Sequence, residues 1–464
     1  MQRRLALSFF DGLSLLGCRR SIGLWPVHLL SYGRRRELSD SPAATDPRWL
    51  LLNRHGLRGD GSSVADASTA ADSHTFEGRH LRVSFCLEAP PASSFLYYDL
   101  PDGDEDDDDD DKDYGITVVA AHGDSVLLQM NGTGRRLPPS YDFCVYDYFV
   151  YRAGATGVRP PSLSLLPARE FTTKNELRLA ESCLDRPLSR SLDERHAGIL
   201  RRGDDELMVV EHEIMYDRTL RRDMAGLCVL RVSSGVWEIK QPVPIIQSNG
   251  DHELPYHRHG TETGFPVGDR FLCWVDYTSG FLLCDMAEEA TPKFGYVPLP
   301  HEVMIRYSDD HEVPPMKHSR GMGAAGDGAV KFVSIDTRCC CGGPGRSTCE
   351  GSRVAFTVTT WTMNLSTDEP MTWVKDGVLE CEELWALPGY EGLPHAHLEC
   401  PVVSLENPDV VCFLVSNHSL DVSYEDWREW MIEIDMKNKA IMSVVEFDSD
   451  SWRAYHHLPA KLQS

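Results

Sequence analysis

The chain has 464 residues, 42% of them hydrophobic and 25% charged, an ordinary globular composition with enough length to bury a sizeable core. Its net charge of −25, from 46 Lys and Arg against 71 Asp and Glu, repels a phosphate backbone and excludes nucleic acid as the expected partner. Cysteines such as Cys228, Cys273, Cys284 and Cys412 stand singly in apolar runs, which excludes a disulfide framework there and indicates reduced core thiols in a reducing compartment.

The first residues form a basic leader, which we expect to run over residues 1–45. Residues 1–36 hold seven Arg, no Lys and one acid, Asp11, so the stretch carries +6 and the rest of the chain −31 (−25 minus 6). An Arg-rich, Ser-containing and acid-poor stretch is typical of a transit peptide, and we expect import into the mitochondrion; a disordered basic tail on a cytoplasmic or nuclear protein is the alternative. Charged residues interrupt the apolar pieces 5–10 and 13–18, so no membrane span is expected.

Two later segments are predicted to be loop insertions. Residues 56–78 are rich in Gly, Ser, Ala and Asp and carry little that could be buried. Residues 102–113, "DGDEDDDDDDKD", form an acidic run that extends by self-repulsion and lacks the spacing of a calcium loop.

Outside these loops the chain predicts short strands, because apolar, β-branched and aromatic runs are bounded by Gly, Pro, Asn, Asp or Ser. These runs lie at 81–87, 116–121, 125–130, 143–151, 206–210, 329–335, 353–363, 410–416 and 440–447. Only two short segments favour a helix, 175–185 and 423–431, the second because Ser423 and Asp426 resemble a capping box. The pattern indicates an all-β protein.

One form recurs: a strand of bulky residues, a tight turn ending in Gly or containing Asn, and a second strand. It appears at 227–242, at 271–286 ("FLCWVDYTSGFLLCDM") and at 431–447, and Gly235 and Gly280 are 45 residues apart. A hairpin that recurs at this interval predicts a β-propeller-like array of four-stranded antiparallel blades, of about five to seven blades. We expect this domain over 46–450, followed by a C-terminal tail over 451–464.

The hairpin at 271–286, together with "FGYVPLP" (294–300), "DPRWLLLNRHG" (46–56) and the segment 360–387, resembles the plant family built on domain of unknown function 1618. That family is expanded in grasses. The resemblance covers roughly residues 46–450 and implies a propeller-like β domain with no established activity, so it carries no catalytic residue to this chain.

Two loops hold candidate metal ligands. Residues 339–351, "CCCGGPGRSTCEG", contain Cys339, Cys340, Cys341 and Cys349, although adjacent cysteines lack the paired spacing of a zinc site. An unconstrained loop between blades is the alternative to a metal or redox site.

The second loop, "DHELPYHRHG", contains His252, His257 and His259. His257 and His259 would share one face of a strand and could both reach a metal, with Glu253 or Glu262 as a third ligand. Residues beside a proline in a loop more often bond locally or face solvent, so metal binding stays one of two alternatives.

Three further patterns favour structure over chemistry. His395 and His397 form a second i, i+2 pair, to which both alternatives apply. "GMGAAG" (321–326) precedes a strand instead of opening a helix, which predicts a flexible loop and not a nucleotide site. Tryptophans such as Trp237, Trp274, Trp361, Trp373 and Trp385 fall in strand patterns, where they are expected to fill space between blades.

These patterns predict a non-enzymatic protein-interaction or regulatory module, because propellers present loops of uneven length around a central opening. We expect a monomer with a protein partner that is basic or neutral, and we predict no catalytic residue and no cofactor. The alternative is a metal-binding protein or hydrolase-type enzyme that uses the His or Cys loops.

Overall fold

The structure is a computed structural model, in which the chain divides into two compact units, residues 1–32 and 33–464. All described residues lie in the second unit: 35–37 (backbone only), 48–59, 66–100, 115–131, 146–155, 157–168, 192, 195–203, 206–247, 260–304, 316–338, 355–367, 369–418, 423, 426–447 and 457–462. The strands, clusters and cavities of the described residues therefore all belong to this unit.

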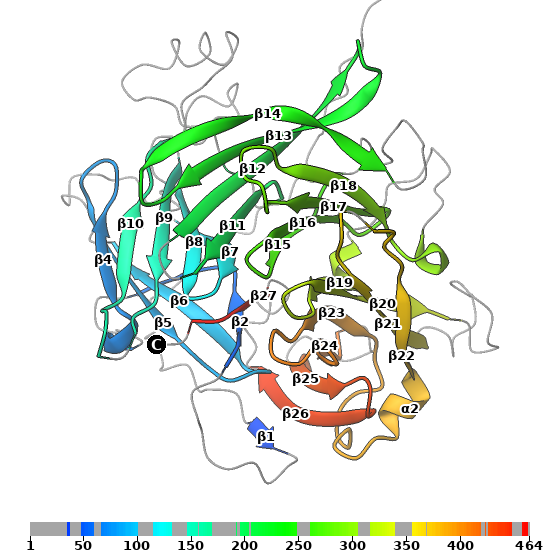
Figure 1. The fold of residues 1–464 in the computed structure, drawn as a ribbon. Helices are drawn as coiled ribbons and strands as arrows, with labels where there is room; N and C mark the ends of the chain where they lie inside the picture. The colour runs from blue at the N-terminus through cyan, green and yellow to red at the C-terminus, as the bar shows by residue number, and fades with distance from the viewer. Residues whose placement is uncertain are drawn as a thin grey trace, which may run out of the picture. The chain divides into compact units, whose positions relative to one another are not determined.

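The described strands form six blades, numbered here in chain order (Figure 1). Blade 1 contains β27 (His457–Ala460), β2 (Leu50–Asn53), β6 (Ser93–Asp99), β5 (His80–Cys86) and β4 (Ala71–His74), with β3 (Leu57–Arg58) paired to β6. Blade 2 contains β7 (Ile116–His122), β8 (Ser125–Asn131), β9 (Tyr146–Arg152) and β10 (Ser162–Leu165). Blade 3 contains β11 (Ala197–Arg202), β12 (Glu206–Asp217), β13 (Arg222–Arg231) and β14 (Val236–Gln247).

Blades 4 to 6 repeat the four-stranded plan of blades 2 and 3, with one strand added to blade 6. Blade 4 contains β15 (Thr263–Val267), β16 (Phe271–Asp276), β17 (Gly280–Asp285) and β18 (Lys293–Pro298), and the end of β14 pairs in parallel with β18. Blade 5 contains β19 (Arg320–Ala324), β20 (Ala329–Thr337), β21 (Phe356–Asn364) and β22 (Val374–Glu380). Blade 6 contains β23 (Leu398–Val403), β24 (Val410–Ser416), β25 (Glu429–Asp435) and β26 (Ala440–Phe447), to which β1 (Arg35–Glu37) is added.

Short helices connect some strands. The described α-helix is α2 (Cys381–Trp385), and the 3-10 turns are η1 (Ala67–Thr69), η3 (His301–Val303) and η4 (Met316–His318). No helix in the described part of the chain is long and apolar enough to cross a membrane.

The inner strands of the six blades contact one another in a closed succession. β7 contacts β11, β11 contacts β15, β15 contacts β19, β19 contacts β23, β23 contacts β27, and β27 contacts β7. The ring of blades is closed by the antiparallel pairing of β27 with β2, which joins the last described strand to the first blade. An all-β propeller-like array of four-stranded antiparallel blades was expected, and this topology confirms it.

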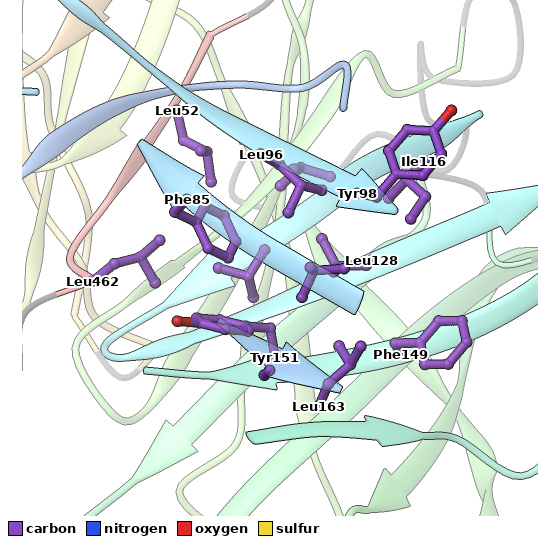
Figure 2. Packing of buried hydrophobic residues seen from close by; sticks show 14 of the residues in the cluster. Leu52, Phe85, Leu96, Tyr98, Ile116, Leu128, Phe149, Tyr151, Leu163 and Leu462 are labelled. Carbon is purple, nitrogen blue, oxygen red and sulfur yellow. The ribbon is translucent and has the colours of Figure 1, made fainter. Parts of the chain in front are cut away.

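Six buried hydrophobic clusters hold the blades together, one at each junction between neighbours. The cluster between blades 1 and 2 includes Phe85, Leu96, Leu128 and Tyr151 (Figure 2). Consecutive residues of one strand serve opposite junctions: Leu272 packs toward blade 3, whereas Cys273 packs toward blade 5. This explains why β16 and β17 are apolar throughout instead of alternating, since both faces are buried.

The recurring hairpins are real, but they occupy different places in their blades. The turn at Gly280 joins the second and third strands of blade 4, whereas the turn at Gly235 joins the third and fourth strands of blade 3. The interval of 45 residues is therefore not a blade-to-blade repeat. The same sequence pattern occurs in the buried hairpin of β16 and β17 and in the hairpin of β13 and β14, whose second strand is exposed at Val236 and Ile239, so the pattern indicates blades without giving their register.

Three local expectations are wrong. The segment 56–78, predicted as a loop insertion, contributes β3, η1 and β4, because Ala71 and Thr75 are buried at the edge of blade 1. The helix expected over 423–431 is replaced by a turn in which Ser423 Oγ donates to Asp426 Oδ2 at 2.8 Å, and β25 begins at Glu429. "GMGAAG" forms most of β19 instead of a loop.

Other expected segments differ in where they fall. The run 102–113 and the helix over 175–185 lie outside the described residues. The segment 451–464, expected as a tail, contributes β27. Trp274 and Trp361 are buried in the junctions on either side of blade 4, as expected, and Cys228, Cys273, Cys284 and Cys412 are buried thiols.

Candidate functional site

The candidate metal ligands of the two loops cannot be placed. His252, His257 and His259 lie within 248–259, and Cys339, Cys340, Cys341 and Cys349 lie within 339–354; both ranges are outside the described residues. A metal site in either loop stays a prediction.

The other candidate ligands, His395, His397 and Glu262, can be placed, and each contacts residues of the protein. His395 stacks on Trp385, with ring centroids 4.5 Å apart. The ring centroids of His397 and Phe356 are 5.6 Å apart. Burial raises the pKa of Glu262, which lies beside Lys317. Over the residues that can be described, no group of three or more His, Cys, Asp or Glu is arranged to hold a metal ion.

The structure instead brings together residues that the sequence did not single out, around a cavity of about 280 Å³ on the axis of the inner strands. We call it the axial cavity. Its walls come from β7, β15, β19, β23 and β27 and from the turns that follow them, together with Arg54 and Tyr277. It is therefore a property of the assembled array and not of one blade.

Glycines bring the backbone of these inner strands close to one another. A Cβ on Gly321 of β19 would collide with the carbonyl oxygen of Pro401 in β23, and a Cβ on Gly323 would lie 3.1 Å from Val403 Cβ. Gly268, after β15, has φ +56° and passes against the carbonyl of Asp327. The "GMGAAG" motif thus serves close strand packing, which narrows the axial cavity.

Arg54 forms part of the cavity wall and connects three blades. It follows β2 and is only 9% exposed. Its Nη1 donates to the carbonyl oxygens of Val118 (3.1 Å) and Val119 (2.9 Å), and its Nη2 lies 3.4 Å from Thr263 Oγ1. A β-bulge in β7 between Val118 and Ala120 makes both carbonyls accessible to one guanidinium.

His122 ends β7 and contributes a neutral donor to the same cavity. Burial, followed by the charge of Arg201, lowers its pKa from 6.5 to about 4. Its Nδ1 accepts the backbone N–H of Arg201 at 2.9 Å, so at neutral pH the hydrogen of the ring is on Nε2. His122 is therefore a fixed tautomer that does not change its charge near pH 7.

The remaining polar residues lie along the same wall. Lys461 and Asp327 are exposed, and His457 Nε2 lies 2.6 Å from Ser93 Oγ. Tyr277 is buried, and its hydroxyl accepts the N–H of Met322 at 3.2 Å. Desolvation raises the pKa of this phenol above its usual value.

Sequence reasoning missed this set because no motif marks it. In the sequence, Arg54 stands within the family-like stretch "DPRWLLLNRHG", and His122 directly follows a predicted strand. A cation two residues after the apolar stretch "WLLL", with only Asn53 between them, is the available signal, since such a residue has to find partners inside the fold.

Comparison with known proteins gives a family but no activity. Residues 274–412 match the model of a family described as "Protein of unknown function (DUF1618)", which confirms the expected resemblance over that range. No curated protein matches the chain.

Three solved structures that are similar to the chain resemble it only distantly. The WD40 domain of SCAP from fission yeast has a TM-score of 0.32 at 8% identity, covering 82% of this chain and 74% of that one. A putative glycoside hydrolase from Bacteroides ovatus has a TM-score of 0.25 at 12% identity, covering 71% and 85%. An endo-1,5-alpha-L-arabinanase from Thermotoga petrophila has a TM-score of 0.26 at 8% identity, covering 87% and 99%. Scores this low carry no argument about function.

Proposed function

Because residues 274–412 belong to the DUF1618 family, whose description names no activity, we propose a function from the geometry alone. The chain is a non-enzymatic protein-interaction module, and the axial cavity receives a hydrogen-bond-accepting side chain or chain end of a protein partner.

The donor-rich wall of the axial cavity carries this proposal. Arg54, the Nε2–H of His122 and the ammonium of Lys461 are donors, whereas Asp327 is the one carboxylate among the described lining residues. The rest of the wall is mostly apolar side chains, Gly and Pro. Such a wall favours a carbonyl or carboxylate over a cation.

The size of the cavity supports a partner over a large substrate. A volume of about 280 Å³ is at or below the lower end of the range for small-molecule sites, which is roughly 300–1,000 Å³. One side chain or a chain terminus fills such a space, and the surrounding turns can contact the rest of a protein partner.

The protonation states also favour binding. A general acid or base works best with a pKa near the working pH, and the pKa of His122 is about 4. The phenol of Tyr277 has a raised pKa and already accepts a backbone N–H, so it is a poor base at neutral pH.

The test is affinity capture with the tagged full-length chain, followed by identification of retained proteins. Ala324→Phe places a ring on the cavity wall, and Ala290→Phe, at an exposed position away from the cavity, is the matched control. We expect a near-stoichiometric partner that the control retains and Ala324→Phe loses. A partner held equally by both variants, or about one equivalent of bound metal and no partner, would contradict the proposal.

A further inference from the structure

A second, larger cavity lies at the junction of blades 1 and 2, and it is independent of the axial cavity. We call it the interblade cavity; its volume is about 750 Å³. Its walls come from Leu50 of β2, Phe85 and Leu87 at the end of β5, the turn between β9 and β10, and Leu462 after β27. Figure 2 shows Phe85, Tyr151 and Leu462 around this end of the cluster.

Most of the wall is apolar, and the hydroxyl groups of Tyr151 and Thr69 have partners within the protein. The rings of Phe85 and Tyr151 pack with centroids 4.6 Å apart. The Tyr151 hydroxyl donates to the carbonyl of Thr69 at 2.8 Å, and Thr69 Oγ1 accepts the N–H of Phe85 at 2.8 Å. These groups form part of the cavity wall, and their hydrogen bonds are made within the protein.

Arg159 differs from the other polar residues of the wall. Its Nη2 donates to Asp124 Oδ2 at 2.7 Å and to the carbonyl of Ala153 at 2.9 Å. Asp124 also forms ion pairs with Arg152 and Arg201, so its single negative charge only partly compensates the positive charge of Arg159. The Nε–H of Arg159 is buried and makes no hydrogen bond to any described atom.

The backbone holds Arg159 in place. The N–H of Ala155 donates to the Arg159 carbonyl at 2.7 Å, and the N–H of Arg159 donates to the Ala155 carbonyl at 2.9 Å. Gly154 permits this tight turn, since a Cβ there would lie 3.0 Å from the Arg159 carbonyl oxygen and from Pro161 Cδ. The Arg159 side chain is 30% exposed and lines the cavity, so a ligand carboxylate there can reach the accessible part of its guanidinium.

We propose that the interblade cavity binds a small carboxylic acid with an apolar body. A carboxylate oxygen accepts from the Arg159 guanidinium, and the body packs against Leu50, Phe85 and Leu462. The volume is within the range of small-molecule sites. The exposed carboxylate of Asp66 on the same wall disfavours a second negative charge, so the ligand is a monoanion.

Such a ligand would also affect the pairing of β2 with β27, which closes the ring of blades. Leu50 belongs to β2, and Leu462 follows β27, so the ligand contacts both partners of the closing strand pair. Binding then slows hydrogen exchange of the backbone amides in β27.

The test uses decanoate and its neutral counterpart decanamide as probes of the full-length chain, by calorimetry. We expect decanoate to bind at least about tenfold more tightly than decanamide, because only the carboxylate forms a charge-assisted bond with Arg159. Arg159→Gln removes this preference, whereas Arg48→Gln, at an exposed ion pair with Glu406, leaves it unchanged. The proposal is overturned if neither probe binds, or if Arg159→Gln keeps the same preference for decanoate over decanamide as the unmodified chain.

A second variant covers the case in which Arg159→Gln does not fold. Ala155→Phe fills the cavity while keeping the backbone bonds of the turn, and we expect it to weaken both probes at least about tenfold. Ala324→Phe, which blocks the axial cavity, leaves decanoate binding unchanged, so the two proposals can fail separately. Unaltered decanoate binding in a folded Ala155→Phe would place the ligand elsewhere and refute this site.

Discussion

Gly264→Ala tests the packing of the junction between blades 3 and 4. A Cβ on Gly264 would lie 2.6 Å from Trp274 Cδ1, whereas ordinary contact begins at 3.4 Å, so the indole must move by about 0.8 Å (3.4 minus 2.6). Trp274 is fully buried, its ring lies 4.4 Å from that of His212, and its Nε1 donates to the carbonyl of Ala197 at 3.3 Å. It therefore has little room to move.

The expected magnitude follows from two contributions. Overpacking of a buried site costs about 1–3 kcal/mol, and weakening the indole hydrogen bond adds about 0.5–1.5 kcal/mol. We expect Gly264→Ala to lower the free energy of unfolding by about 2–4 kcal/mol. Urea unfolding of the full chain, followed by tryptophan fluorescence and circular dichroism, measures this change.

Gly226→Ala is the matched control, because it also places a methyl group in a strand but makes only ordinary contacts, with Met215 Cε at 3.5 Å and the Glu213 carbonyl oxygen at 3.8 Å. We expect it to change the free energy of unfolding by no more than about 0.5 kcal/mol. In a Trp274→Phe background the cost of Gly264→Ala should fall, because the smaller ring relieves the overlap. If Gly264→Ala and Gly226→Ala unfold at the same urea concentration, the packing argument is refuted.

Three further predictions concern charge and targeting. The folded-state pKa of His122, about 4, is below the ordinary value of 6.5, so the unfolded chain binds the proton more readily. The contribution of His122 to the free energy of unfolding is therefore complete above pH 6.5 and is lost as the pH falls toward 4. His122→Asn should flatten this part of a stability profile measured by urea unfolding, and an unchanged slope would contradict the assignment. Lys331 is 2% exposed and bonds Asp376 at 2.9 Å and Asp409 at 3.1 Å; because these carboxylates remain 28% and 33% exposed, we expect Lys331→Met to cost about 1–3 kcal/mol, less than a fully buried pair. Lys375→Met, at an exposed pair with Glu302, should cost under about 1 kcal/mol in the same assay, and equal costs would refute the role of burial. Residues 1–45 fused to a fluorescent protein should direct it to mitochondria, and a diffuse cellular signal would favour the alternative of a basic tail.

The class of fold was predictable because strand patterning is local. Runs such as 116–121, 329–335 and 410–416 became strands of the array almost residue for residue. The error at 423–431 is physical: Ser423 and Asp426 do bond one another, but Glu429 onward pairs with β24 and β26, and this tertiary pairing overrides the capping signal.

The candidate sites were less predictable because they are assembled from distant segments. The wall of the axial cavity joins Arg54 to His122 and Lys461, which no window of the sequence contains together. Arg159 likewise looks like an ordinary loop cation until β27 and β2 complete the junction beside it. The locally recognisable loops, with His257 and Cys341, fall outside the described residues, so their chemistry remains a prediction.

The pairing of β2 with β27 also sets an order of events during synthesis. β2 emerges early, yet its partner strand is made roughly 400 residues later, which takes about 20–80 s at 5–20 residues per second. Throughout that time one edge of β2 has no native partner and is open to wrong pairing with other chains. Production of this protein in quantity should therefore depend on chaperones and on the rate of translation over the last blade.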